Sequence, residues 1–314
     1  MNVLFTFRIK EEQMEKLKAD FPEVQFFFNK KADEVSIEEY EIIVTYGEDI
    51  TPEVLDRATS LKWLMVASAG VEKMPLAEIA ASGIVISNVR GIHKTPMAET
   101  VLAHILSLGR ALPTLAEQQS RKEWNTKVRQ SEIRGSTALI LGPGAIGSEI
   151  GRLLQVFGVR TIGCNNSGDP AQFMDETIQF DGLLSKLPEA DIVVSVLPST
   201  AKTKGLLTER HFQTMKESAV FMNFGRGDLV KESILVKALK NGGIGHAVLD
   251  VFEKEPLPAE SELWDLSNVT ISPHVSSHSG KYIERALEFF TENLEKWQTG
   301  DRKLTNLIDP EKGY

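Results

Sequence analysis

Three charged side chains that could bind an anion and move a proton follow apolar segments in the second half of the chain: Arg226, Glu255 and His274. A guanidinium fork matches a carboxylate in two-point geometry. A histidine exchanges protons near neutral pH, and a neighbouring carboxylate would stabilise its protonated form. Singly, Arg226 could be a solvated surface residue and His274 a structural one. Together, in this order, they predict a site that binds a small organic acid and transfers a proton.

A glycine-rich turn upstream of this trio predicts dinucleotide binding. The apolar segment 137–141 leads into Gly142-Pro-Gly-Ala-Ile-Gly147, and an amphipathic helical pattern follows. In G-x-G-x-x-G, Gly142 allows the tight turn, Gly144 lets the backbone approach a pyrophosphate, and Gly147 lets helix and strand pack closely. The helix N-terminus attracts the phosphates. The alternative is a glycine-rich turn without a ligand, but the flanking strand and helix favour the nucleotide.

The identity of the dinucleotide depends on the end of the next strand, where Asn165 and Asn166 stand. An NAD site usually carries Asp or Glu about here to bind the ribose 2′-hydroxyl. A neutral residue would not repel a 2′-phosphate, yet no cation follows to bind one. Arg160 begins the strand, roughly 16 Å away at about 3.3 Å per residue. We therefore expect NAD or NADP with a slight preference for NADP, and a simple turn at Asn165-Asn166 stays open.

The elements that must position these residues form two series of alternating strands and helices. The first series has strands expected at 2–7, 24–28, 41–46, 62–67 and 84–88, with helices at 11–19, 52–59 and 74–81. The second has strands expected at 137–142, 160–164, 191–197, 219–224, 246–251 and 269–272. Such series predict an α/β protein with two doubly wound parallel sheets and a ligand in the cleft between them.

Two longer helical patterns connect and close these series. Apolar residues recur at three- and four-residue steps over 96–118, with Thr95 as a plausible N-cap, Pro96 in the first position and Pro113 as a kink or an end. This helix is the expected crossover between the sheets. A last helix is expected at 280–299, and its simplest place is back against the first domain.

Composition narrows the function classes. The 314 residues carry 35 Lys and Arg against 44 Asp and Glu, a net charge of −9, which disfavours nucleic-acid binding. No apolar run is long enough to span a bilayer, no leader precedes the first strand, and the single cysteine, Cys164, cannot form an intrachain disulfide, so we expect a cytoplasmic protein. Metal-ligand spacing and the G-x-S-x-G elbow of hydrolases are absent from the sequence, so no metal is expected.

Taken together, the motifs resemble the D-isomer-specific 2-hydroxyacid dehydrogenase family over nearly the whole chain. They are Ala69-Gly70-Val71, Ala98-Glu99, Leu141–Gly147, Leu197-Pro198 with Thr203, Asn223–Val230, Leu249–Pro256 and Ser272-Pro-His274. The resemblance is closest to the glyoxylate/hydroxypyruvate reductase branch and to short phosphoglycerate-dehydrogenase-like proteins.

The resemblance implies roles for individual residues. His274 would be the general acid/base, Glu255 its partner, and Arg226 a substrate ligand, while backbone amides at Ala69 and Gly70 would hold the substrate carboxylate. The cofactor contacts it implies or allows are at Gly142, Gly144, Ala145, Ile146, Gly147, Asn165, Asn166, Pro198, Thr203, Phe224, Asp250 and Ser276.

The resemblance also implies an architecture and a reaction. Residues 1–97 plus 286–314 would form a flavodoxin-like substrate-binding domain, and residues 98–285 a Rossmann dinucleotide-binding domain. Members are commonly homodimers through the nucleotide domain, and they interconvert 2-keto acids and D-2-hydroxy acids. One alternative is an NAD(P)H-sensing protein of the same fold with little turnover, which would not need the intact trio. A second is a related formate dehydrogenase, which would call for Gln in place of Glu255.

Overall fold

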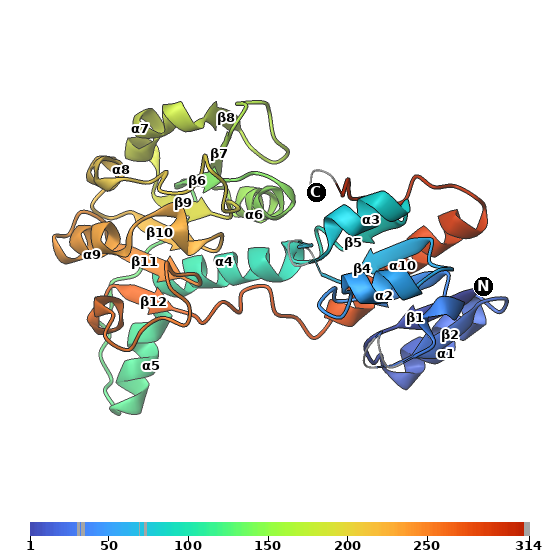
Figure 1. Cartoon of the computed structure of the whole chain (residues 1–314). Coiled ribbons are helices and arrows are strands. Elements are labelled where there is room, and N and C mark those ends of the chain that lie inside the picture. The colour runs from blue at the N-terminus through green and yellow to red at the C-terminus, as the bar shows by residue number, and fades with distance from the viewer. Residues whose placement is uncertain (30–31, 33–34, 69, 72–73, 311–314) are drawn as a thin grey trace. The chain divides into compact units, whose positions relative to one another are not determined.

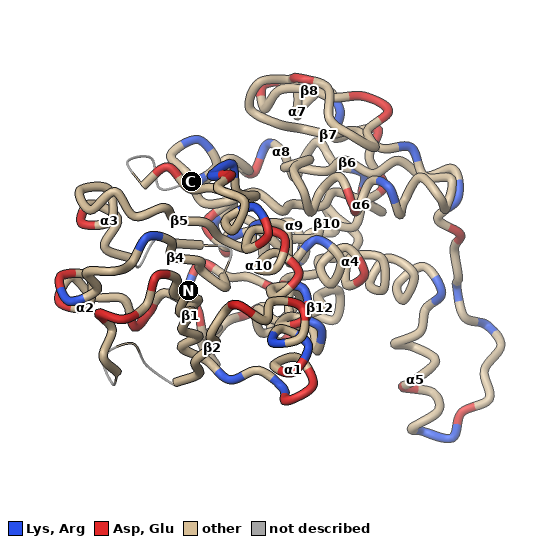
Figure 2. Tube along the Cα trace, turned by 90° about the vertical axis from the view of Figure 1, so that its right-hand side faces the viewer, with Lys and Arg blue, Asp and Glu red and all other residues tan. Residues whose placement is uncertain are grey.

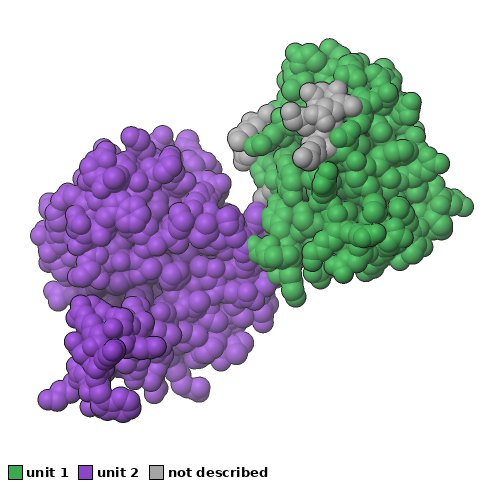
Figure 3. Space-filling model, turned by 90° about the horizontal axis from the view of Figure 1, so that it is seen from below, with its two compact units in different colours: residues 1–92, 279–314 green, residues 93–278 purple. Residues whose placement is uncertain are grey.

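The chain folds into two compact units, residues 1–92 with 279–314 and residues 93–278 (Figure 3). In the computed structural model, residues 1–29, 32, 35–68, 70, 71 and 74–310 are described. Each unit contains one parallel sheet with helices packed against it (Figure 1). None of the helices within these ranges combines the length and the apolar character needed to cross a bilayer.

The first unit is built on a five-stranded parallel sheet in the order β2-β1-β3-β4-β5. Its strands are β1 (Asn2–Phe5), β2 (Gln25–Phe28), β3 (Ile42–Thr45), β4 (Trp63–Val66) and β5 (Val85–Asn88). Its helices are α1 (Glu11–Asp20), α2 (Pro52–Arg57), α3 (Leu76–Ser82) and α10 (Tyr282–Gln298). β3 and β4 are buried along their whole length, as expected for strands covered on both faces. The order is the flavodoxin-like one, which confirms the expected fold class.

The last helix, α10, packs on the sheet of the first unit, as predicted. The Phe290 ring lies 5.1 Å from that of Phe5 and 5.8 Å from that of Trp63, and the Trp297 ring lies 5.5 Å from Trp63. Phe290 is fully buried. Truncating a phenylalanine to alanine in such a position typically costs about 3–5 kcal/mol of stability. The C-terminal segment therefore completes the core of the N-terminal unit.

The second unit contains a seven-stranded parallel sheet in the order β12-β11-β10-β9-β6-β7-β8. Its strands are β6 (Thr137–Leu141), β7 (Arg160–Asn165), β8 (Glu176–Gln179), β9 (Ile192–Ser195), β10 (Val220–Asn223), β11 (His246–Leu249) and β12 (Val269–Ile271). Its helices are α4 (Lys94–Gly109), α5 (Leu112–Ser120), α6 (Ala145–Val156), α7 (Leu183–Lys186), α8 (Glu209–Thr214) and α9 (Glu232–Lys240). This is the doubly wound order of dinucleotide-binding sheets, with one strand added after β11.

Strand β8 was not predicted from the sequence. Its residues, Glu-Thr-Ile-Gln, are short, largely polar and only partly buried, and the strand pairs with β7 alone at the edge of the sheet. An edge strand with one apolar residue gives no alternating pattern to detect.

The prediction of a single helix over residues 96–118 is wrong. The chain forms two helices, α4 and α5, separated at Ala111, whose φ of 53° lies in the left-handed region. Pro113 falls in the first turn of α5, where its missing N–H costs nothing. Thr95 is not the N-cap, because α4 already begins at Lys94. Pro96 tolerates either start, since the first four helical N–H groups have no intrahelical partner.

Helix α5 and the chain that follows it project from the rest of the second unit (Figures 1 and 2). None of the α5 residues is buried, Leu112 is 51% exposed, and Trp124 beyond the helix is 96% exposed. This segment therefore presents large apolar side chains that the chain itself does not cover.

Candidate active site

A cavity opens where the order of the seven-stranded sheet reverses. β6 and β9 are neighbours in the sheet but not in the sequence, so the connections that leave them diverge. Ligands of doubly wound sheets bind at this switch point, outside the carboxyl ends of the strands. The cavity has a volume of about 640 Å³ and is lined by Gly142, Pro143, Gly144, Asn165, Asn166, Phe180, Leu197, Pro198, Thr200, Ala201, Lys202 and Thr203.

The glycine turn at one side of this cavity has the geometry that a pyrophosphate requires. A Cβ atom on Gly147 would lie 2.3 Å from the carbonyl oxygen of Gly142, so only glycine lets α6 pack this closely on the turn. A Cβ atom on Gly144 would meet no atom within 4 Å, so the space beside it is open. Gly144 is the N-cap of α6, and Ala145 and Ile146 open its first turn. Open space in front of free helical N–H groups fits an anionic ligand.

The two asparagines at the end of β7 differ in what their side chains do. The Asn165 Nδ2 donates to the Asp169 carbonyl at 2.9 Å, and its Oδ1 accepts from the Gly168 N–H at 2.6 Å. Asn165 therefore holds the turn that follows β7. The Asn166 Oδ1 instead accepts a hydrogen bond of 2.9 Å from the Nζ of Lys202, which follows β9. Both asparagines line the cavity.

Lys202 is a functional candidate that the sequence analysis missed. It stands 36 residues from Asn166 in the chain, so no local pattern connects the two. The turn that carries it is braced by Thr203, whose Oγ1 donates to the Pro198 carbonyl at 2.6 Å and accepts from the Thr200 N–H at 2.9 Å. Thr203 is buried and Lys202 is exposed.

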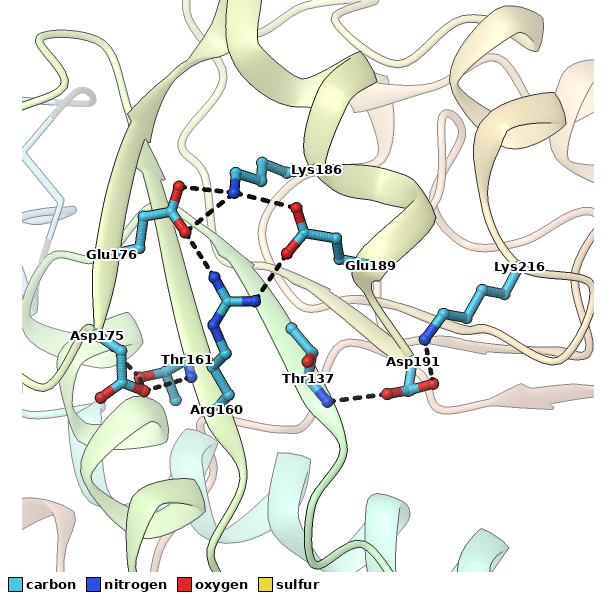
Figure 4. A network of polar contacts seen from close by, with 9 residues as sticks. All are labelled: Thr137, Arg160, Thr161, Asp175, Glu176, Lys186, Glu189, Asp191 and Lys216. Atoms are coloured by element: carbon cyan, nitrogen blue, oxygen red, sulfur yellow. Dashed lines mark hydrogen bonds and ion pairs between the residues drawn. The ribbon is translucent and has the colours of Figure 1, made fainter.

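Arg160 lies at the opposite end of β7, as the sequence indicated, and is engaged there. Its guanidinium makes ion pairs of 2.7 Å with Glu176 and with Glu189, and Lys186 joins the same two carboxylates (Figure 4). The neighbouring carboxylates raise the pKa of Arg160 further above its ordinary value, chiefly through the hydrogen bond to Glu189. Arg160 therefore belongs to a surface network away from the cavity.

Arg226 lies three residues after the end of β10, at the carboxyl edge of the sheet. A Cβ atom on the next residue, Gly227, would lie 1.9 Å from backbone atoms of Phe252, so glycine is required for these two connections to touch. The Asn223 Nδ2 donates to the Arg226 carbonyl at 2.9 Å and fixes the backbone. The side chain of Arg226 is exposed, and its Nη1 donates to the Gly225 carbonyl at 2.8 Å. The guanidinium is thus presented to solvent from a rigid backbone.

Glu255 and His274 form the pair that the sequence predicted. The His274 Nδ1 lies 2.8 Å from the Glu255 Oε2, and the other carboxylate oxygen of Glu255 accepts from the Phe252 N–H at 3.0 Å. A carboxylate only accepts hydrogen bonds, so the proton of the neutral ring lies on Nδ1 and leaves Nε2 for chemistry. The His274 side chain is 46% exposed. The second unit by itself therefore holds a histidine whose ring is oriented by a carboxylate.

Asp250 organises the loop that carries His274. Its buried carboxylate accepts hydrogen bonds from the Ser272 Oγ at 2.6 Å, the Val275 N–H at 3.0 Å and the Ser276 N–H at 3.1 Å. Burial raises the pKa of the Asp250 carboxyl, but these hydrogen bonds outweigh burial and bring the pKa below its ordinary value. Asp250 was expected only as a cofactor contact, and its bracing of residues 272–276 was not foreseen.

The remaining predicted residues are distributed over both units. The Phe224 side chain is buried in the core at the end of β10, and Ser276 is buried beside Asp250. Gly70 is exposed in the first unit, where its carbonyl accepts a hydrogen bond of 2.7 Å from the Ser68 Oγ. Ala69 lies outside the described residues. Within the described ranges, no group of three or more His, Cys, Asp and Glu side chains could hold a metal ion.

Comparison with known protein families gives a match over more than half of the chain. Residues 102–276 match the family described as "D-isomer specific 2-hydroxyacid dehydrogenase, NAD binding domain". Among curated relatives, a glyoxylate reductase from Thermococcus gammatolerans is 30% identical over 83% of this chain and 80% of its own length. Some curated relatives are longer, and the chain spans about half of their length.

Solved structures agree with this match. A D-isomer specific 2-hydroxyacid dehydrogenase family protein from Aeromonas salmonicida is 33% identical, with a TM-score of 0.81 over 98% of this chain and 99% of that one. An NADPH-dependent glyoxylate/hydroxypyruvate reductase from Sinorhizobium meliloti, solved with citrate, is 25% identical, with a TM-score of 0.76 over 98% of both chains.

Proposed function

Because this chain belongs to the D-isomer specific 2-hydroxyacid dehydrogenase family, we propose that it interconverts a small 2-keto acid and its D-2-hydroxy acid with NAD(P). The observation that carries the proposal is the 2.8 Å contact between His274 and Glu255, on the same parallel sheet as a dinucleotide-type switch point. That contact joins residues 19 positions apart from two different strand ends. A protein that only senses a nucleotide has no need of it.

His274 is the proposed general acid and base. With Nδ1 held by Glu255, Nε2 would donate a proton to the carbonyl oxygen during reduction and remove it from the hydroxyl during oxidation. Glu255 would keep the ring in one orientation and stabilise the imidazolium form. Asp250 would act through the loop, by holding residues 272–276 in place.

Arg226 is the proposed ligand of the substrate carboxylate and carbonyl. Its exposed guanidinium offers several N–H donors in a planar fork, which suits an α-keto acid with adjacent oxygen atoms. We assign the backbone amides at Ala69 and Gly70 to the substrate carboxylate on the family resemblance. The first unit would thereby be the substrate-binding domain and the second the dinucleotide-binding domain.

The proposed cofactor is NAD or NADP. The α6 N-terminus and the open space at Gly144 would hold the pyrophosphate, and the cavity wall of Phe180, Leu197 and Pro198 would face the adenine. On the family resemblance, we assign Asp250 and Ser276 to the nicotinamide side and keep Phe224 as a cofactor contact. When bound, the nicotinamide would supply the hydride for reduction of the carbonyl carbon, or accept it in the reverse direction.

We also propose a homodimer that covers the projecting α5 segment. The support is the family resemblance together with the exposed Leu112, Leu115 and Trp124. Sedimentation equilibrium should give twice the 34.8 kDa mass of the chain. A mass of one chain at micromolar concentration would overturn this part of the proposal.

The reaction is tested by loss of absorbance at 340 nm. NADPH and NADH are each offered with glyoxylate, hydroxypyruvate, pyruvate, phenylpyruvate and 2-ketoisocaproate. Turnover that forms the D-2-hydroxy acid supports the proposal and identifies the substrate class. Tight binding of NADPH or NADH by fluorescence with no turnover across the panel would favour the sensing protein instead.

A further inference from the structure

The cavity at the switch point is lined by a cation, Lys202, that makes no ion pair with any described residue. Among the described residues that line it, Lys202 is the only cation and none is acidic. Lys202 donates to the neutral amide oxygen of Asn166 at 2.9 Å, and no ion pair of Lys202 occurs in the part of the chain that the structure describes. An ammonium group that lines a ligand cavity and is hydrogen-bonded to a neutral amide is available to bind an anion.

The position of this cation points to one part of a dinucleotide. Asn166 directly follows the last residue of β7, which is the second strand of the seven-stranded sheet in chain order. An acidic residue at this strand end accepts from the ribose 2′-hydroxyl of NAD and repels a 2′-phosphate, whereas a cation there accommodates the phosphate. Here one amide ends the strand and a second follows it, and the cation comes from the connection after β9.

Other cations near this region are less well placed. Arg160 is held by Glu176 and Glu189 at the opposite end of β7 (Figure 4). Lys204, two residues beyond Lys202, does not line the cavity. The Lys202 side chain begins on a turn braced by the buried Thr203, so its backbone is fixed while its ammonium group can exchange acceptors. A phosphate oxygen is the stronger acceptor, because its negative charge attracts the ammonium group and a neutral amide oxygen carries no such charge.

We infer that Lys202, supported by Asn166, binds the 2′-phosphate of the adenosine ribose and makes NADPH the preferred cofactor. This assignment rests on the proposed function, because it concerns the cofactor of the same site. Lys202 supplies the cation that the end of β7 lacks, and it comes from the connection that follows β9.

The experiment compares Lys202→Met with Lys204→Met as a matched control. The affinities for adenosine 2′,5′-bisphosphate and for 5′-AMP are measured by calorimetry, which needs no turnover, and the affinities for NADPH and NADH by fluorescence. Lys202→Met should weaken the bisphosphate and NADPH by roughly 10–100-fold, as expected for the loss of a charged hydrogen bond, with 5′-AMP and NADH changed by less than about threefold. Lys204→Met should behave as the wild type.

The outcomes separate this inference from the function on which it rests. Equal weakening of NADPH and NADH by Lys202→Met, or an equal effect of Lys204→Met, would overturn the role of Lys202 while leaving the reductase intact. A wild type that binds NADH at least as tightly as NADPH would do the same. A wild type that binds neither dinucleotide would overturn the proposed function itself, and the inference with it.

Discussion

The carboxyl edge of the seven-stranded sheet has two parts that are held in different ways. After β11 and β12, the side chains are already bonded to neighbouring groups: Asp250 accepts three hydrogen bonds from residues 272–276, and Glu255 holds the proposed acid and base His274 at 2.8 Å. After β7 and β9, the backbone is fixed, but the charged side chain, Lys202, is exposed and donates a hydrogen bond to the neutral amide of Asn166. Proton transfer needs a histidine that is held in one orientation before the substrate binds. Discrimination between NADPH and NADH needs only a charge of the right sign near the ribose 2′ position. Changes in the first part should therefore alter turnover, and changes in the second should alter cofactor affinity.

The largest expected effect is that of His274→Ala. Removing a general acid and base should lower kcat by about 10²–10⁴-fold, because proton transfer then depends on water. NADPH binding should remain within about twofold, since the cofactor cavity does not include His274. The matched control is His278→Ala, an exposed histidine in the same segment. Normal turnover in His274→Ala would remove this residue from the mechanism.

Arg226→Lys should have the next largest effect. A lysine keeps the charge but offers a point in place of a fork, so one of two charged hydrogen bonds to the substrate is lost. We expect kcat/KM for the keto acid to fall roughly 10–100-fold with little change in cofactor affinity. Steady-state kinetics with both substrates varied measure this. A fall in cofactor affinity with unchanged keto-acid kinetics would place Arg226 with the nucleotide rather than the acid.

Asp250→Asn tests whether the preset geometry depends on the buried carboxylate. An amide N–H₂ directed at the donors of residues 272–276 should cost about 1–3 kcal/mol of stability and lower kcat moderately, as the loop that carries His274 loosens. The asparagine variant and the wild type are compared by denaturant unfolding and by kcat. Wild-type kcat in a variant that is clearly less stable would mean that the loop does not need this brace for catalysis.

The same variant should change the pH dependence of unfolding. The pKa of Asp250 is lowered in the folded state, so its contribution to stability is present above the unfolded pKa of about 4 and is lost as the pH falls through the folded value. The wild type should therefore lose more stability than Asp250→Asn between about pH 5 and 3. Parallel pH profiles for the two proteins would contradict this assignment.

The smallest expected effect comes from the strand end after β7. Asn166→Asp should pair with Lys202 and repel a 2′-phosphate, which should lower the preference for NADPH over NADH by about tenfold. Asn165→Asp is the matched comparison. Its side chain donates to the Asp169 carbonyl, so this change should mainly weaken the turn. A larger shift in preference at position 165 than at 166 would mean that Asn165, rather than Asn166, faces the ribose.

The sequence by itself determined the fold class and much of the candidate site. The strand and helix periods predicted two doubly wound sheets, and the order β2-β1-β3-β4-β5 and the seven-stranded order agree. The glycine turn and the contact of Glu255 with His274 were also expected. These features depend on local patterns of apolar residues and on turn chemistry, which a single sequence displays.

Only the tertiary structure decided which strand ends become neighbours. The hydrogen bond from Lys202 to Asn166 and the bonds from residues 272–276 to Asp250 join connections that leave different strands. The break at Ala111 and the edge strand β8 also have little local signal. Side chains 20 or more residues apart meet because strands pair in a particular order, and that order is chosen by how the whole sheet buries its two faces. The proposed catalytic pair was therefore predicted from its residue types, while the cation that we propose for cofactor choice emerged only once β7 and β9 were placed on either side of β6.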